Sequence, residues 1–343
     1  MASTTGTDLV TGNGPRKILS NSIDLKPGDF SSIPILDLSL AFSPDLLDRK
    51  KCAEQLFDAC TRVGFFYIKN HNVPEKVISD CFQCARDFFD LESEEKMKIY
   101  IKDSENYKGY TPLLGENTDP AGRGDLHEGF DIGYEYTPSS TSDSEHKMEG
   151  TNRWPEALPS IKAPVTKYFE HMVTLGKKLF QLFALSLDLE EEYFDRMVSG
   201  KGGIMRLLHY PPQKEDNVDM KQLGIGAHSD YECFTVLAQQ EGIEALQVLN
   251  SSGEWVSAVP LEGTFVVNVG DSMARWTNDL YLSTIHRAIN RTGVRRYSVP
   301  FFFGVDYETT IEVLESCTSE SRPPKYKPIN AGQYIKQRLN ETY

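Results

Sequence analysis

The chain has 343 residues, of which 39% are hydrophobic, and it carries a formal net charge of −14. This apolar fraction is enough for a sizeable core, whereas the negative charge would repel nucleic acid and anionic membrane surfaces, so we expect neither as a partner. The sequence has no apolar run of about 18 residues that would predict a membrane span, and its first residues lack the apolar stretch of a signal peptide.

The first third of the chain predicts an arm followed by an α/β region. Residues 1–30 are polar and rich in Gly, Ser and Thr, which predicts a loosely held, flexible N-terminal arm. Residues 31–150 alternate between strand and helix periodicity. The expected elements are strands at 33–38 and 65–68 and helices at 45–62, 74–89 and 92–100. The stretch at 104–153 is rich in Gly, Pro and charged residues, and 139–144 within it predicts a surface loop.

The rest of the chain changes from helical to β-rich patterning. Residues 151–200 predict helices at 158–187 and 189–197. Residues 201–310 carry short β-rich runs separated by turns, which is typical of a jelly roll or barrel. The expected strands are 205–210, 234–238, 246–249, 255–259, 264–269, 283–289 and 296–303. Residues 311–343 end in an expected helix at 331–339. We therefore predict a single domain over 31–343, mainly β with flanking helices.

The six cysteines are sparse for a chain of this length. Cys81 and Cys84 have the spacing of half a zinc site, but they lie in a helical pattern and no second Cys or His pair follows them. We interpret them as free thiols on or beneath a helix. Because free thiols indicate a reducing compartment, we expect a cytoplasmic protein.

A candidate metal site begins in the segment Gly-Ala-His-Ser-Asp at 226–230. On a strand, the side chains of His228 and Asp230 would point to the same face. His286, further along the chain, offers a third ligand. Two His and one carboxylate on one face of an octahedron leave three positions open, which suits iron(II) that must bind a co-substrate and then oxygen. The His-x-Asp pair alone is weak evidence, because a single His is more often a surface or hydrogen-bonded structural residue.

A candidate anion site follows ten residues later, in the expected strand at 296–303. Arg296 presents a planar fork that can bind a carboxylate through two hydrogen bonds, and Ser298 on the same face can add a third. An arginine in the centre of an apolar strand is costly unless an anion meets it. The alternative is a buried ion pair between Arg296 and an Asp or Glu of the protein.

Together these features resemble the 2-oxoglutarate- and iron(II)-dependent dioxygenases, in the branch that contains isopenicillin N synthase and the plant and fungal hydroxylases. The motifs that carry the resemblance are His228-x-Asp230, His286, Arg296-x-Ser298 and Tyr210 within Leu207–Pro212. The likeness extends to 33–37, 64–67, 88–91 and 267–271, and covers roughly residues 30–340. Among fungal members, the chain is most similar to the thymine hydroxylases. It departs from the commoner pattern at Leu208, where many relatives carry Asn, and at Ala245, where Gly is frequent.

The resemblance implies a double-stranded β-helix, or jelly-roll, core with a long helix packed on it. It places His228 and Asp230 on one strand and His286 on another, with Fe(II) as the metal. The enzyme would oxidise, and by default hydroxylate, an unactivated C–H bond of a small molecule. Secondary metabolism is the expected setting.

The resemblance also implies 2-oxoglutarate as co-substrate and O2 as oxidant, with succinate and CO2 as products. Arg296 and Ser298 would bind the far carboxylate of 2-oxoglutarate, assisted by Tyr210. The protein would supply orientation and anion binding, and it need not supply a general base.

Three alternatives stay open from the sequence. An oxidase of the isopenicillin N synthase kind shares these motifs but takes all its electrons from the substrate and does not consume 2-oxoglutarate. A zinc hydrolase could use the same His/Asp/His set, although it would have no use for Arg296. A non-catalytic binding protein could retain the fold. Neither the substrate nor the oligomeric state follows from the sequence.

Strand parity predicts the substrate pocket. The face that carries Arg296 and Ser298 continues to Phe302, and the face that carries Tyr210 continues to Leu208 and Arg206. A cation at position 206 would favour a substrate with a carboxylate, phenolate or carbonyl group. The alternatives are an ion pair between Arg206 and a nearby Asp or Glu, and a core position for Phe302.

Overall fold

An eight-stranded sheet forms the centre of the computed structural model, which describes residues 7–18, 32–118, 124–136, 150–213 and 222–342. Its strand order is β3-β4-β12-β9-β14-β7-β6-β5, with antiparallel pairing throughout except between β3 and β4. The strands are Ile35–Asp37 (β3), Phe65–Lys69 (β4), Gly109–Thr111 (β5), Glu128–Gly133 (β6), Gly203–Tyr210 (β7), Phe234–Gln239 (β9), Thr264–Val269 (β12) and Arg296–Phe303 (β14).

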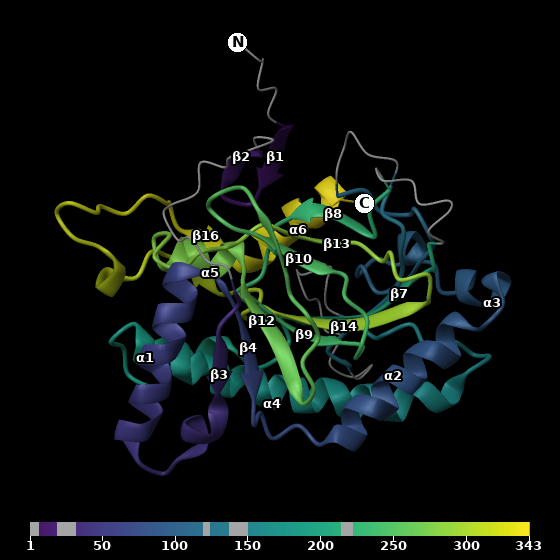
Figure 1. Cartoon of the computed structure of the whole chain (residues 1–343), viewed down its shortest axis with the longest axis horizontal. Helices are drawn as coiled ribbons and strands as arrows, with labels where there is room; N and C mark the ends of the chain where they lie inside the picture. Colours follow the sequence, from purple (N-terminus) through teal and green to yellow (C-terminus); the bar gives the residue numbers. More distant parts are fainter. Residues whose placement is uncertain (1–6, 19–31, 119–123, 137–149, 214–221, 343) are drawn as a thin grey trace.

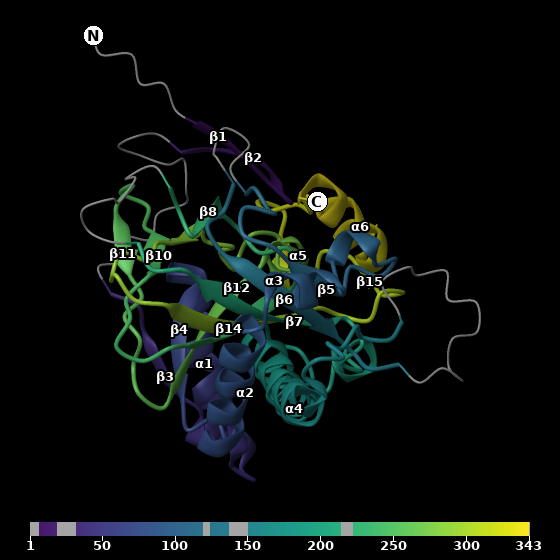
Figure 2. The ribbon, with the colours of Figure 1, turned by 90° about the vertical axis from the view of Figure 1, so that its right-hand side faces the viewer.

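A smaller antiparallel sheet, in the order β11-β10-β13-β8, lies on one side of the large sheet (Figures 1 and 2). Its strands are Ile225–His228 (β8), Leu246–Leu249 (β10), Trp255–Ser257 (β11) and His286–Ala288 (β13). The two sheets form the jelly-roll core, and the predicted class of a mainly β fold with flanking helices is confirmed.

Helices cover the other side of the large sheet, where α1, α2 and α4 lie (Figures 1 and 2). The helices are Leu46–Arg62 (α1), Glu75–Phe89 (α2), Ser93–Met97 (α3), Lys162–Ser186 (α4), Asp271–Trp276 (α5) and Ala331–Thr342 (α6). Asp45 caps α1 by accepting a hydrogen bond from the Leu47 N–H. Cys81 and Cys84 lie buried on α2 as free thiols, as predicted. Within the described ranges, no helix is both long enough and apolar enough to cross a membrane.

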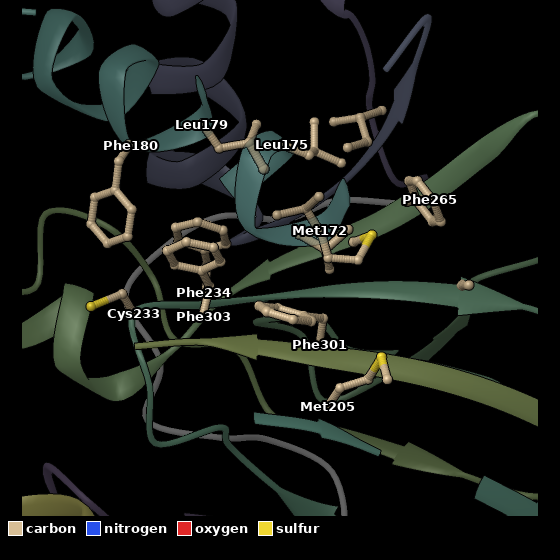
Figure 3. Close-up of a cluster of buried hydrophobic side chains, with 14 of the residues drawn as sticks. Met172, Leu175, Leu179, Phe180, Met205, Cys233, Phe234, Phe265, Phe301 and Phe303 are labelled. Atoms are coloured by element: carbon tan, nitrogen blue, oxygen red, sulfur yellow. The ribbon is translucent and has the colours of Figure 1, made fainter. Parts of the chain in front are cut away.

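The main core lies between the long helix α4 and the large sheet (Figure 3). Phe180 of α4 packs its ring 5.1 Å from that of Phe234 on β9 and 5.5 Å from that of Phe303 on β14, and these last two rings are stacked. Burial of large side chains here stabilises the sheet by about 1.5–3 kcal/mol each. The core therefore holds β9 and β14 rigid, and the opposite face of both strands is free to build a site.

Two local predictions differ from the structure. The helix expected at 189–197 is reduced to a 3-10 turn at Asp195–Met197, while the break between it and the long helix is present at Asp188, whose backbone is left-handed (φ 58°). In the stretch 104–153, for which no strand was expected, the structure contains β5 and β6, whereas the surface loop expected at 139–144 lies outside the described residues. Phe130 and Ile132 of β6 point into the core and Asp131 points to the cavity, but the two glycines and two acidic residues of this short strand give little sequence signal for it.

The N-terminal arm also differs from its expected loose state. Residues 7–18 form a hairpin of Thr7–Thr11 (β1) and Gly14–Ile18 (β2), while the remainder of the arm lies outside the described residues. At the hairpin turn, the Gly12 N–H donates to the Asp271 carboxylate at 2.8 Å, and the Asn13 side chain donates to the Asp271 carbonyl at 3.1 Å. These hydrogen bonds attach the hairpin to the start of α5.

We expect Gly176→Ala in the middle of α4 to destabilise the fold by about 1–3 kcal/mol through overpacking. A Cβ at this position would lie 1.9 Å from an atom of the Phe303 ring. At an unobstructed helix position, the same change would stabilise by about 0.5–1 kcal/mol. Urea unfolding measures the difference, with Lys177→Ala at the adjacent exposed position as the control. A gain in stability for Gly176→Ala would contradict the close packing of α4 on β14.

Candidate metal and co-substrate site

Two facing strands and the turn after one of them bring three candidate ligands together. His228 ends β8, His286 begins β13, and the two are cross-strand partners in the small sheet. Asp230 lies beyond the end of β8, so the expectation that it shares a strand with His228 is not met. Its carboxylate nevertheless lies 3.6 Å from Nε2 of His228 and 3.7 Å from Nε2 of His286. One ligand atom from each residue lies within 4.8 Å of the others.

The Asp230 carboxylate is held in its ionised form. Thr235 Oγ1 and Asn268 Nδ2 both donate hydrogen bonds to its Oδ2, the latter at 2.7 Å. Burial would raise the pKa of Asp230, but the neighbouring imidazoles of His286 and His228 and these two hydrogen bonds hold it below its usual value. Burial and the neighbouring imidazole of His228 lower the pKa of His286 to about 4. His286 is therefore neutral near pH 7 and can act as a metal ligand.

Both imidazole rings are oriented by backbone carbonyls. Nδ1 of His228 lies 2.8 Å from the Gly226 oxygen, and Nδ1 of His286 lies 3.2 Å from the Thr284 oxygen. A carbonyl can only accept, so each Nδ1 carries the proton and each Nε2 keeps its lone pair. The two Nε2 atoms and the Asp230 oxygen converge, and this donor set fits a divalent metal with open coordination positions.

A buried cation faces the same cavity. Arg296 is 1% exposed, and its guanidinium lies 4.7 Å from the ring centre of Tyr210, its cross-strand partner on β7. Within the described part of the chain, its Nε and Nη1 have no hydrogen-bond partner. Burial lowers the pKa of Arg296, although Tyr210 opposes the effect. Ser298 follows on the same face and is also buried. Buried N–H donors without partners require an anion, so this site fits a carboxylate.

Every residue that the sequence singled out for the site lines one cavity of about 160 Å³. The predicted residues on its wall are Arg206, Leu208, Tyr210, His228, Asp230, His286, Arg296, Ser298 and Phe302. Antiparallel register explains the grouping, since Ser298 faces Leu208 and Phe302 faces Ile204 across β14 and β7. Phe302 lines the cavity instead of the core that was its alternative.

The charge of Arg206 is neutralised inside the protein. Its Nε donates to Asp131 at 2.6 Å, and its two terminal nitrogens donate to the two oxygens of Glu116. Burial would raise the pKa of Glu116, but Arg206 and His127 hold it well below its usual range. Arg206 thus forms the ion pair given as its alternative. The expectation that it attracts a substrate carboxylate is wrong, because Asp131 and Glu116 already accept the hydrogen bonds of its guanidinium.

Three acidic residues of the cavity wall were missed by sequence reasoning: Glu116, Asp131 and Glu232. The first two lie in the stretch 104–153, where no strand was expected, and only the register of β6 on β7 brings Asp131 opposite its cation. Glu232 lies two residues beyond Asp230. Burial and the charge of Asp230 raise the pKa of Glu232 to about 8. Its proximity to the metal motif was the one signal that could have identified it.

Behind the metal motif, Asp271 connects four segments. Its carboxylate accepts hydrogen bonds from Ser229 at 3.1 Å, from Ser283 at 2.7 Å and from the Gly12 N–H, and Arg16 lies 3.9 Å away. Burial raises the pKa of Asp271, although Arg16 and these hydrogen-bond donors oppose the effect. Because Ser229 stands between two candidate ligands, Asp271 fixes the turn that carries them.

Comparison with known proteins agrees with this geometry. Residues 201–305 match the family described as the 2OG-Fe(II) oxygenase superfamily, and residues 33–157 match the N-terminal region described as non-haem dioxygenase in morphine synthesis. A 2-oxoglutarate-Fe(II) type oxidoreductase of Metarhizium rileyi is 35% identical over 99% of this chain and 95% of its own length. A homoarginine-6-hydroxylase of Glycine max is 38% identical over 90% of this chain and 96% of its own length.

Solved structures show the same relationship. Full-length Neurospora crassa T7H in complex with alpha-KG superimposes with a TM-score of 0.82 at 30% identity, covering 93% of this chain and 98% of that one. The same protein with alpha-KG and thymine gives a TM-score of 0.80 at 29% identity, covering 93% and 99%.

We expect Arg206→Met to destabilise the protein by about 3 kcal/mol, because it leaves two buried carboxylates without their cation. The triple variant Arg206→Met, Glu116→Gln, Asp131→Asn removes the stranded charges and should recover part of the loss. Urea unfolding gives both values. Arg62→Met, which breaks an exposed ion pair with Asp58, is the control and should cost under about 1 kcal/mol. A loss for Arg206→Met no larger than the control would contradict the neutralisation of Arg206 by Glu116 and Asp131.

Proposed function

The chain belongs to the 2OG-Fe(II) oxygenase superfamily, and we propose that His228, Asp230 and His286 hold its iron while Arg296, Ser298 and Tyr210 bind 2-oxoglutarate. It is a 2-oxoglutarate- and Fe(II)-dependent dioxygenase that oxidises a small molecule. One observation carries the residue assignment. A convergent His/Asp/His set and a buried arginine with unsatisfied donors line the same cavity.

The residues of this chain hold and orient the reactants. Fe(II) and 2-oxoglutarate, when bound, supply the chemistry that oxidises a C–H bond with O2 and releases succinate and CO2. Thr235 and Asn268 keep the Asp230 carboxylate ionised and fixed, which preserves one face of ligands and leaves the other face open. The Arg296 fork sets the direction of the co-substrate, because a bidentate pair permits one orientation of a carboxylate.

We propose hydroxylation as the reaction and a nitrogen-containing metabolite as the substrate. Relatives at 31–38% identity are named homoarginine-6-hydroxylases, and T7H has been solved with thymine, so small nitrogen compounds recur among similar proteins. Secondary metabolism is the proposed setting, supported by the fungal relatives. A cytoplasmic location is supported by the free state of all six cysteines. The net charge of −14 supports the absence of nucleic-acid and membrane partners.

One experiment distinguishes the proposed dioxygenase from the alternative, an oxidase that uses no 2-oxoglutarate. Iron-loaded protein is supplied with candidate metabolites, and O2 uptake and succinate release are measured with and without 2-oxoglutarate. Dependence on 2-oxoglutarate, with stoichiometric succinate, supports the proposal. Turnover without it would establish the oxidase.

We expect His228→Ala and Asp230→Ala to abolish metal binding and turnover while the fold remains. Each change removes one of three ligands, and two ligands hold a metal poorly. Metal content by mass spectrometry and circular dichroism provide the two measurements. His171→Ala, at a partly exposed position of α4 that is not on the cavity wall, is the control and should keep both metal and activity. Retention of one metal per chain in the Ala variants would place the site elsewhere. As isolated, the protein can carry nickel or zinc, because iron(II) lies low in the affinity order.

We expect Arg296→Leu to weaken 2-oxoglutarate binding by roughly 30- to 1,000-fold, the effect of losing about 2–4 kcal/mol of charged hydrogen bonding. Calorimetric titration of the nickel-loaded protein measures it directly. Ser298→Ala and Tyr210→Phe should show smaller losses of the same kind. The apparent constant for the organic substrate should change far less. Equal effects on co-substrate and substrate would contradict the assignment of Arg296.

A further inference from the structure

Glu232 is a buried carboxylate that the assignments above leave unused. Its side chain lies on the cavity wall and is 8% exposed. Among the described residues, no cation forms an ion pair with its carboxyl group and no other side chain donates a hydrogen bond to it. Its own backbone N–H donates to it, and the charges of Asp230, Asp271 and Arg206 act on it from a longer distance. A buried carboxyl group without a side-chain partner is costly, so a ligand group that hydrogen-bonds to it would be stabilised here.

None of the described arginines on or beside the cavity wall forms an ion pair with Glu232. Arg206 is bound by two carboxylates, and Arg296 faces the co-substrate position. Arg287 donates to Gln247 and stacks 3.8 Å from the ring centre of Trp255, on the face of β13 opposite to the metal ligand. On α6, Arg338 lies over the ring of Tyr231 at 4.7 Å. Glu232 is therefore a carboxyl group of the cavity wall for which the described residues provide no side-chain partner.

The backbone that carries Glu232 is tightly held. Its carbonyl oxygen accepts from the Ser272 N–H at 3.3 Å, and the neighbouring Cys233 carbonyl accepts from the Gly270 N–H at 2.9 Å. A Cβ on Gly270 would lie 2.2 Å from the Glu232 oxygen, so this close approach needs glycine. The carboxylate is thus presented from a rigid turn, two residues beyond a metal ligand. A group bound there would lie beside the reacting centre.

We propose that Glu232 determines substrate specificity by binding a protonated nitrogen of the substrate, in the form of an ammonium, amidinium or guanidinium group. The proposal rests on the proposed function, because it assigns a substrate to the same cavity. The apolar residues of the cavity wall define the rest of the expected substrate. Ile204, Phe302 and Leu339 offer hydrocarbon surface, so the expected ligand is an aliphatic chain or ring that carries a basic nitrogen.

Matched pairs of probes test the charge directly. Full-length protein loaded with nickel(II), which prevents turnover, and with 2-oxoglutarate is titrated calorimetrically with n-butylguanidinium against n-butylurea, and with cyclohexylammonium against cyclohexanol. Each pair has nearly the same shape and differs in charge. We expect the cation of at least one pair to bind about 10- to 100-fold more tightly than its neutral partner, as a partly buried ion pair implies.

Glu232→Gln should abolish this preference while nickel and 2-oxoglutarate bind as before. Glu262→Gln removes one exposed charge far from the cavity wall and is the matched control for the general acidity of the chain; it should keep the preference. Thermal unfolding verifies that both variants fold.

The proposal is overturned if no cation binds better than its neutral partner, if Glu232→Gln keeps the preference, or if it weakens nickel or 2-oxoglutarate binding. The last result would make Glu232 a support of the metal site. A wild-type protein that binds neither nickel nor 2-oxoglutarate would instead overturn the proposed function, and the two failures are therefore distinguishable.

Discussion

Ionised side chains buried between two β-sheets must each meet an opposite charge or a set of hydrogen-bond donors, and this requirement organises the cavity. Glu116 and Asp131 are satisfied by Arg206 within the protein. Asp230 is satisfied in part by Thr235 and Asn268. Arg296 Nε and Nη1 and the carboxyl group of Glu232 have no hydrogen-bond partner among the described side chains, and they mark where the groups of a bound ligand belong. The division between internal and external partners is what makes the cavity a binding site.

Rigid packing on one side of the sheet allows polar groups on the other. The aromatic core between α4 and the large sheet fixes β9 and β14, whose opposite faces carry Thr235, Arg296 and Ser298. Because side chains alternate along each strand, successive residues point either into the hydrophobic core or into the polar cavity. A buried arginine is tolerable here because the hydrophobic face stabilises the strand that carries it.

Elements far from the cavity also determine where the candidate ligands lie. Asp271 binds Ser229 and Ser283, which belong to the segments that carry the two histidines, and it also binds the turn of the N-terminal hairpin. Segments separated by more than 250 positions in the chain thus share one carboxylate. The hairpin is part of the support of the site, a role that its polar composition did not indicate.

The sequence alone determined the elements and residues whose signals are local. Periodicity predicted the main helices and most core strands, and the His-x-Asp and Arg-x-Ser spacings identified residues that the structure brings into one cavity. The tertiary structure alone decided what each charge meets. Glu116, Asp131 and Arg206 are distant in sequence, and their pairing depends on strand register and on a loop whose position no local pattern encodes. Electrostatic partners are set by distance in space, so the sequence identified Arg206 as a cation but could not show that it is neutralised, or that Glu232 is not.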